Sequence, residues 1–500
     1  MPTQAKRAGE AVTKYEAATT LEMTSYLPAA VTTPLVQGAD LLRGALGGVT
    51  WGPALSVSKA AVTSLLKKIE IGQLTILDET TGQKTTYGQK LAKEHHKKSN
   101  GTNGVNGAAK KAGGVRNVEL VVKRETFWVR LFLFADMGFA ESYMLGDFEC
   151  EDLTSFFELF ILNRSQLANA TTLTSSIAAT ITGLARSTNT LSNSLLNIQA
   201  HYDISNEMFA AFLSPDMTYS CPIWKLVSSA DTEEESLEAA QMTKLNRFID
   251  GARIKSTDHV LEIGTGWGSF AMEAVRKTGC RVTTLTLSIE QKALAEKRIA
   301  AAGMSDKIEI LLMDYRALPT PKVLYDKVVS IEMLEAVGAE YLETYFSCIH
   351  RLLKKDGIAV FQCITMPEGR YEAYAKGEDF IRKYIFPGGH LPSISQLVEN
   401  ISKGSDGTLV VEKIENIGGH YAKTLRLWRE EFLRNFESRI RPALMNEHDN
   451  MGEKEVEVFR RKWIYYFVYC EAGFRTKTLG DAIITVSREG GLETMEGIPL

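Results

Sequence analysis

The residues best suited to chemistry form a glycine-rich segment near the middle of the chain, Val260–Phe270 (VLEIGTGWGSF). An apolar run that leads into glycines and then into helix-forming residues predicts a buried strand, a tight turn and a helix. Such a turn lets backbone N–H groups approach a ligand, and Glu262 at the strand end can accept hydrogen bonds from an ammonium group. Ser269 stands where a dinucleotide fingerprint needs glycine, which disfavours NAD and FAD. The segment therefore predicts a site for an amino-acid-like ligand, although an ordinary strand-to-helix turn has the same pattern.

A second candidate site follows the next predicted strand, residues 281–287. Its end carries Thr286 and Leu287, followed by Gln291, in place of the carboxylate that commonly binds ribose hydroxyls. Hydroxyl and amide groups can make the same contacts as neutral hydrogen bonds. Glu290 is also available, but an acidic residue early in a helix can equally serve the helix dipole. The sequence leaves both interpretations of Glu290 open.

The elements around these residues alternate between strand and helix patterns, which predicts a parallel, doubly wound α/β sheet. Ligands of such sheets bind at the carboxyl ends of the strands. Strands are expected at 258–263, 281–287, 307–312, 325–331 and 357–364, and helices at 236–252, 268–278, 288–302 and 338–353.

The rest of the chain divides by composition into regions of different character. The expected regions are a flexible N-terminus (1–35), a smaller N-terminal domain (36–170), a disordered Gly/Asn/Lys-rich loop within it (93–114), a linker helix (171–199) and a main domain (200–500) with a helical lid near 366–475. Within the N-terminal domain we expect helices at 51–70 and 151–163 and strands at 72–78, 118–123 and 127–134.

The bulk composition narrows the class of protein. Five hundred residues exceed one compact core, and 44% hydrophobic with 24% charged residues is typical of a soluble globular protein. The net charge of -4 disfavours a nucleic-acid binder. The six cysteines are scattered without a C-x-x-C pair, which disfavours structural zinc and fits a reducing compartment. No apolar run reaches the roughly 18 residues of a membrane span, and neither a signal nor a transit peptide is expected. If the substrate is a lipid, the enzyme must meet it at a membrane surface or carry it.

Further motifs give the chain a specific resemblance. They are HYDISNEMF (201–209), MTYSC (217–221), SIEMLEAVG (330–338), KYIFPGGHLP (383–392), GGHYAKTL (418–425) and DMGFAESYMLGD (136–147). With the glycine turn, they resemble the cyclopropane-fatty-acyl-phospholipid synthase family, which includes the mycolic acid cyclopropane synthases, over about residues 36–490. The sequence of residues 330–338 is most similar to that of the eukaryotic, plant-like branch. Nothing here resembles the flavin-oxidase half that plant members often carry.

The resemblance implies a class I methyltransferase fold with a helical lid, plus a smaller N-terminal α+β domain. It implies that a cis double bond of a phospholipid acyl chain attacks the methyl group of S-adenosylmethionine and that the resulting carbocation loses a proton as a cyclopropane ring closes. Bound bicarbonate is the base that the family implies. The alternative is a C-methyltransferase that gives a methyl-branched product from another unsaturated lipid, such as a sphingoid base. A third possibility is an inactive lipid-binding protein.

The resemblance also assigns residues to roles. For the bicarbonate pocket, they are the backbone near Cys221, the side chains of Glu335, Gln362 and Tyr421, and the backbone of Ile364. For the cofactor, they are Tyr219, Ser220, Glu262, Gly264, Gly266, Thr286, Leu287, Gln291, Tyr315 and Arg316. No metal is expected. The implied partners are an unsaturated phospholipid at a membrane surface and a second copy of the chain, with a cytoplasmic, peripherally membrane-associated location.

Some residues depart from the family pattern or allow a purely structural interpretation. Gln362 stands where bacterial members carry His, and Glu332 stands where many carry Gly. In some mycolic acid enzymes, an acidic residue at the position of Glu332 accompanies hydroxylated methyl products. The Cys221 thiol has no His at a readable spacing, so we expect it to be structural. The aromatic residues of 463–474 suit an acyl tunnel or, more commonly, a plain core.

Overall fold

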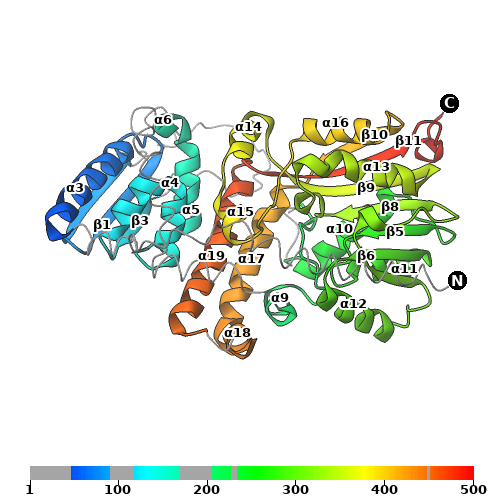
Figure 1. Cartoon of the computed structure of the whole chain (residues 1–500), viewed down its shortest axis with the longest axis horizontal. Helices are drawn as coiled ribbons and strands as arrows, with labels where there is room; N and C mark the ends of the chain where they lie inside the picture. Colours follow the sequence, from blue (N-terminus) through cyan, green and yellow to red (C-terminus); the bar gives the residue numbers. More distant parts are fainter. Residues whose placement is uncertain (1–46, 90–116, 169–204, 227–233, 448–450, 500) are drawn as a thin grey trace, which may run out of the picture.

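The structure is a computed structural model that describes residues 47–89, 117–168, 205–226, 234–447 and 451–499. The expected flexible N-terminus, disordered loop and linker helix lie outside these residues. His201 and Tyr202 lie outside them as well. Along the long axis of Figure 1, an N-terminal sheet with its helices is followed by a layer of helices and then by a larger sheet.

The larger sheet has seven strands in the order β10-β11-β9-β8-β5-β6-β7. Strands β7, β6, β5, β8 and β9 run parallel, and β11 is antiparallel to both β9 and β10. The predicted doubly wound α/β sheet is confirmed. The strands are β5 (His259–Ile263), β6 (Arg281–Thr286), β7 (Ile308–Leu312), β8 (Tyr325–Ile331), β9 (Leu353–Thr365), β10 (Leu409–Asn416) and β11 (Gly480–Arg488).

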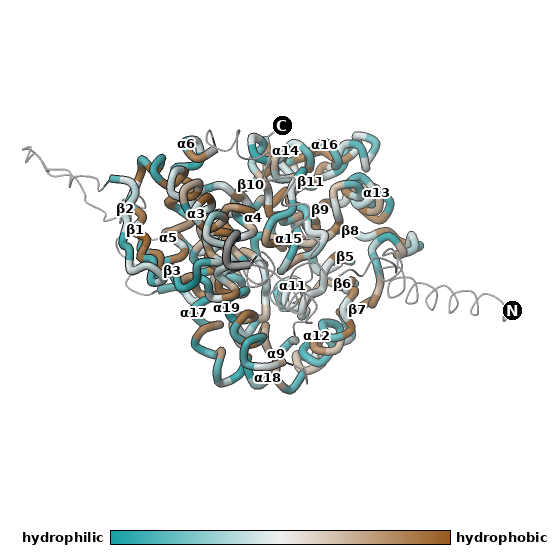
Figure 2. Tube along the Cα trace, turned by 60° about the vertical axis from the view of Figure 1, so that its left-hand side comes forward, coloured by the Kyte–Doolittle hydropathy of each residue, from teal (hydrophilic) through white to brown (hydrophobic). Residues whose placement is uncertain are grey.

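Helices cover both faces of this sheet, because neighbouring residues of its central strands are apolar and point to opposite sides. In β5, Val260 belongs to one buried cluster with Phe270 of α11, whereas Leu261 belongs to another with Phe346 of α13. Figure 2 shows hydrophobic and hydrophilic stretches alternating along the outer helices, as expected for helices with one buried side. The covering helices are α10 (Leu237–Gly251), α11 (Ser269–Thr278), α12 (Ile289–Ala301), α13 (Leu342–Leu352) and α16 (Ile394–Gly404).

The helical layer beside the sheet comes mostly from the segment expected to be a lid. That segment also supplies α16 and the edge strand β10, so only part of it lies over the strand ends. Helices α17 and α19 pack against each other, and α19 contacts α4 and α5 of the N-terminal unit. The layer contains α9 (Asn206–Phe212), α14 (Glu368–Lys376), α15 (Phe380–Tyr384), α17 (Gly419–Asn435), α18 (Arg441–Glu447) and α19 (Glu453–Arg475).

The N-terminal unit is a four-stranded sheet in the order β2-β1-β3-β4, with helices packed on it. Strands β1 and β3 are parallel, while β2 and β4 are antiparallel to their neighbours. Its elements are α3 (Gly47–Leu66), β1 (Gly72–Asp78), β2 (Gln83–Gln89), β3 (Asn117–Val122), α4 (Thr126–Met144), β4 (Phe148–Glu149), α5 (Leu153–Leu162) and α6 (Arg164–Ala168).

The strand expected at 127–134 is wrong, since this segment is the first half of α4. Phe127, Trp128 and Val129 are all buried, and a continuous apolar run does not distinguish a buried strand from a buried helix. The helix is kinked at Ala135, whose φ is 49°. Beyond the kink, Glu141 accepts hydrogen bonds from Lys383 (3.0 Å) and Tyr384 (2.8 Å), which joins the N-terminal unit to the helical layer.

No helix among the described residues combines the length and the apolar character that a membrane crossing requires.

Candidate active site

The glycine turn after β5 has the backbone that the sequence predicts. Gly264, Gly266 and Gly268 have φ of 102°, 50° and 87°, conformations that residues with a Cβ rarely adopt. A Cβ on Gly264 would lie 2.4 Å from Cγ of Met333, whereas a Cβ on Gly266 would meet no atom within 4 Å. Gly264 is therefore needed for packing as well as for backbone shape.

This contrast predicts different effects for two alanine substitutions. Gly264→Ala must displace Met333 and should destabilise the protein by about 1–3 kcal/mol more than Gly266→Ala, which meets only the backbone strain. Gly266→Ala should still weaken cofactor binding, because its methyl group enters the cavity. Denaturant unfolding together with calorimetry checks both results, and equal unfolding free energies for the two variants would contradict the first.

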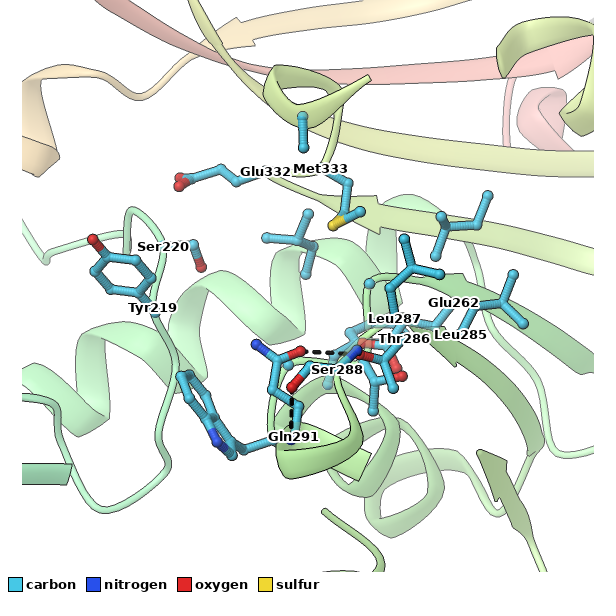
Figure 3. A pocket seen from close by; sticks show the side chains of 18 of the residues that line it. Tyr219, Ser220, Glu262, Leu285, Thr286, Leu287, Ser288, Gln291, Glu332 and Met333 are labelled. Carbon is cyan, nitrogen blue, oxygen red and sulfur yellow. Dashed lines mark hydrogen bonds between the residues drawn. The ribbon is translucent and has the colours of Figure 1, made fainter. Parts of the chain in front are cut away.

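A cavity of about 640 Å³ lies beside this turn, at the carboxyl ends of β5, β6 and β8. Figure 3 shows its side chains converging from the turn, from the segment after β6 and from the loop before α10. All ten residues predicted to bind the cofactor line it: Tyr219, Ser220, Glu262, Gly264, Gly266, Thr286, Leu287, Gln291, Tyr315 and Arg316. The sequence reasoning did not single out Lys244 and Met333, which also line the cavity.

Glu262 is the buried acidic group of the cavity. Burial raises the pKa of its carboxyl to about 8, while Thr284 and the Lys244 ammonium act in the opposite direction. Its Oε2 atom is buried without a hydrogen-bond partner, so it is available to accept a hydrogen bond from a bound ligand. Lys244 itself donates to Oγ of Ser220 at 2.6 Å. A cationic group bound against Glu262 would satisfy Oε2 and neutralise the carboxylate.

Polar groups after β6 line the cavity as expected. The Thr286 hydroxyl donates to Oε1 of Gln291 at 3.0 Å, and Ser288 caps α12 by accepting from the Gln291 backbone N–H at 3.1 Å. Glu290 is exposed and does not line the cavity; its carboxylate accepts from the Ser288 hydroxyl. The helix-terminus interpretation of Glu290 therefore holds.

The five residues predicted for the bicarbonate pocket do not line the cavity; they lie behind Glu332, which does. Oε1 of Glu332 accepts from the Cys221 backbone N–H at 2.8 Å and from Nε2 of Gln362 at 2.7 Å. Oε2 accepts from the Tyr421 hydroxyl at 2.7 Å. Three of the expected anion donors thus converge on a carboxylate of the protein itself.

Two more carboxyl groups lie beside Glu332. Oε1 of Glu335 accepts from the Ile364 backbone N–H at 2.5 Å, and Oδ2 of Asp481 accepts from Nε2 of Gln362 at 2.8 Å. The sequence reasoning missed Asp481, although an aspartate at the start of the apolar run DAIITV (481–486) is a readable signal. Among the described residues, no group of His, Cys, Asp and Glu is arranged to hold a metal ion.

The charges of this cluster are unequal. Burial is the main cause that raises the pKa of all three carboxyls, and that of Glu335 rises to about 8. The Glu332 charge raises the pKa of Glu335 and Asp481 further, while hydrogen bonds from Cys221 and Tyr421 and the Lys244 charge lower that of Glu332. Like charges in one site do not ionise together, and Glu332, with three hydrogen-bond donors and the Lys244 charge beside it, is the member best placed to carry the negative charge.

Cys221 contributes its backbone, and its thiol is inert. The thiol is buried, its Sγ contacts the Pro222 and Ile417 carbonyl oxygens, and burial raises its pKa well above the ordinary value. Such an environment suppresses the thiolate.

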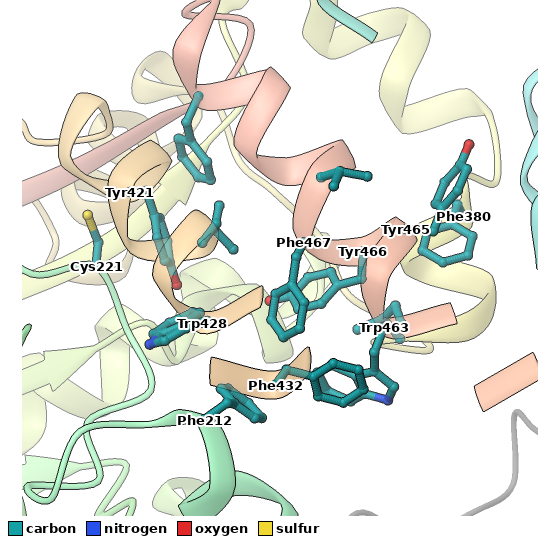
Figure 4. Packing of buried hydrophobic residues seen from close by; sticks show 14 of the residues in the cluster. Phe212, Cys221, Phe380, Tyr421, Trp428, Phe432, Trp463, Tyr465, Tyr466 and Phe467 are labelled. Carbon is teal, nitrogen blue, oxygen red and sulfur yellow. The ribbon is translucent and has the colours of Figure 1, made fainter. Parts of the chain in front are cut away.

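The aromatic residues of α19 form core packing. Figure 4 shows Trp463, Tyr465 and Phe467 packed among side chains of the neighbouring helices. None of the α19 aromatics expected to line a tunnel borders the cavity. Tyr466 connects to it indirectly, because its hydroxyl is 2.9 Å from that of Tyr219.

The chain is similar to proteins of a known family. A model of the mycolic acid cyclopropane synthetase family matches residues 189–481, more than half of the chain. The chain belongs to this family. It is an S-adenosylmethionine-dependent methyltransferase that modifies lipid acyl chains.

The similarity to individual proteins covers more residues than the family model matches. Tuberculostearic acid methyltransferase UfaA1 of Mycobacterium tuberculosis is 37% identical over 361 residues, which are 71% of this chain and 79% of the relative. A cyclopropane-fatty-acyl-phospholipid synthase of Escherichia coli is 33% identical over 383 residues, which are 76% of this chain and 91% of the relative. The solved structure of coclaurine N-methyltransferase aligns with a TM-score of 0.52 over 71% of this chain and 99% of that one, and at 19% identity it shows a shared fold.

Proposed function

We propose that this enzyme transfers a methylene group from S-adenosylmethionine to the cis double bond of an unsaturated phospholipid acyl chain. The observation that carries this proposal is the junction of two sites. A cavity lined by all ten expected cofactor residues meets, at Glu332, a buried carboxyl cluster able to take a proton. The synthase of Escherichia coli, 33% identical over most of its length, supports the choice of substrate.

The residues of the cavity fit the cofactor. The buried, unpartnered Oε2 of Glu262 suits the ammonium group. Thr286 and Gln291 suit the ribose hydroxyls, and Tyr315 with Arg316 suits the adenine ring. When bound, S-adenosylmethionine supplies an electrophilic methyl group. A π bond needs no base to activate it as a nucleophile. The remaining tasks of the chain's own residues are to position the alkene, to exclude water and to accept the proton that leaves after methyl transfer.

Bicarbonate fits the site less well than the resemblance implies. Each of its four expected donors already donates to a carboxylate: Cys221, Gln362 and Tyr421 to Glu332, and Ile364 to Glu335. A free anion would have to displace the protein's own acidic side chains. Bicarbonate therefore takes part in no step of the proposed reaction.

One residue and one relative favour a second possible product, a methyl-branched lipid in place of a cyclopropane. Glu332 stands where many bacterial members of the family carry glycine, and the relative at 37% identity is named a tuberculostearic acid methyltransferase. An unsaturated lipid alkylated here and deprotonated at a neighbouring carbon would give a methyl-branched alkene.

The proposed setting is a membrane surface facing a reducing compartment. All six cysteines are unpaired. The N-terminal unit, which α19 and α15 join to the larger sheet, is proposed to present the lipid or to mediate dimerisation. The cytoplasmic location and the homodimer are part of the same proposal.

Expression in a host that lacks such an activity tests the function. We expect the host's mono-unsaturated phospholipids to gain one methylene unit and lose their double bond. Gas chromatography with mass spectrometry of the fatty acids measures this change. Retention of the double bond in the heavier product would favour the methyl-branched alternative, and an unchanged lipid profile from folded protein would contradict both.

A further inference from the structure

Glu332 has an unusual backbone. Its φ is 48°, in the left-handed region that glycine adopts freely and that a glutamate rarely adopts. Such a conformation costs about 1–3 kcal/mol and persists where the surrounding structure enforces it, most often at functional sites. The strain places the Glu332 side chain at the wall of the cavity, where Figure 3 shows its carboxylate on the side of Tyr219 and Ser220.

Three hydrogen-bond donors and one nearby cation favour the ionised form of this carboxylate, against burial, which raises its pKa. The carboxylate accepts hydrogen bonds from the Cys221 backbone N–H, the Gln362 amide and the Tyr421 hydroxyl, all between 2.7 and 2.8 Å. Gln362 and Tyr421 are buried, and the ammonium of buried Lys244 acts on the same charge. Asp481 and Glu335 have their pKa raised by the Glu332 charge, so they remain the protonated members of the cluster.

We propose that the Glu332 carboxylate is the base of this enzyme and that the reaction needs no bicarbonate. The inference rests on the proposed function and deepens it by naming the proton acceptor. It follows from geometry: Glu332 is the member of the carboxyl cluster that lines the cavity, and it occupies the donors through which a free anion would be bound.

The step balances without any further reactant. The π electrons of the alkene form a bond to the methyl carbon as the sulfur–methyl bond breaks, and the sulfur leaves as a neutral thioether. The other alkene carbon becomes a cation. Glu332 removes a proton from the transferred methyl group, and the electron pair of that C–H bond closes the three-membered ring. The carboxyl, now neutral, returns its proton to solvent once the product has left the cavity.

Two substitutions and one condition test this inference. Glu332→Gln keeps the size of the side chain but removes the base, and we expect about 100-fold or greater loss of cyclopropane product with S-adenosylmethionine binding retained in calorimetry. Glu332→Gly relieves the backbone strain and leaves the three hydrogen-bond donors without their acceptor. Added bicarbonate should then raise the activity of this variant by at least about tenfold. Wild-type activity should be the same in carbonate-free and bicarbonate-supplemented buffer. Glu343→Gln, an exposed change on α13, is the matched control.

The outcomes separate this inference from the proposed function. Wild-type activity that falls in carbonate-free buffer and returns with bicarbonate would overturn the inference, as would a Glu332→Gln variant at full rate. If bicarbonate does not raise the activity of Glu332→Gly, this result also counts against the proposal that Glu332 occupies the donors of a free anion. A wild-type protein that binds S-adenosylmethionine but makes no product under any condition would instead overturn the proposed function.

Discussion

Tyr421→Phe should lower the rate of product formation by about 30- to 100-fold, while the affinity for S-adenosylmethionine stays close to that of the wild type. The hydroxyl of Tyr421 donates to Oε2 of Glu332 at 2.7 Å. Its loss leaves a half-buried carboxylate short of one donor, which raises the pKa of Glu332 and leaves less of it in the ionised form that can accept a proton. Single-turnover measurement of product, alongside calorimetry, separates this effect from binding.

The packing around Tyr421 makes this change a clean one. Its ring lies 4.7 Å from Phe474 and 5.8 Å from Trp428, and phenylalanine keeps both contacts. Tyr371→Phe is a suitable control, because it removes a hydroxyl bonded to His390 and lies away from the cavity. A Tyr421→Phe enzyme with the wild-type rate would show that the Glu332 network does not act in the reaction.

Glu262→Gln should weaken S-adenosylmethionine binding by about 100-fold, because a hydrogen bond to a charged partner in a buried site is replaced by a neutral one. The wild-type interaction should also depend on pH. Burial raises the pKa of free Glu262 to about 8, so about nine-tenths of it is protonated at pH 7. Binding a cation requires the carboxylate, and wild-type affinity should therefore fall as the pH drops below about 8.

Calorimetry in buffers of different ionisation enthalpy measures the proton directly. The wild type should release close to one proton per cofactor bound at pH 7, and Glu262→Gln should release none. Glu290→Gln provides the control, since that residue is exposed and outside the cavity. Equal proton release by the wild type and Glu262→Gln would remove Glu262 from the cofactor site.

Much of the larger sheet was predictable from local pattern. The strands β5 to β8 fall within about one residue of their expected bounds, because short apolar runs between helices with clear caps leave few alternatives. The glycine turn was predictable for a different reason: Gly264, Gly266 and Gly268 occupy positive φ, which few other residues tolerate.

Other features depend on contacts that local pattern does not contain. The first half of α4 was expected to be a strand because its sequence is a continuous apolar run. The tertiary packing that buries Phe127 and Trp128 in a helix is not visible in that run. Strand β10 pairs with β11, about 70 residues later, and neither was expected. The role of Glu332 as the centre of a hydrogen-bond network requires that β8, β9, α17 and the loop at Cys221 meet, which only the fold decides.

Incubation of the purified protein with mono-unsaturated phospholipid vesicles and methyl-trideuterated S-adenosylmethionine tests the central chemistry most directly. We expect a fatty acyl product that has lost its double bond and retains two of the three deuterons, because one is removed as the ring closes. A product that keeps all three deuterons together with a double bond, or vesicles left unmodified by folded, cofactor-binding protein, would contradict cyclopropane formation.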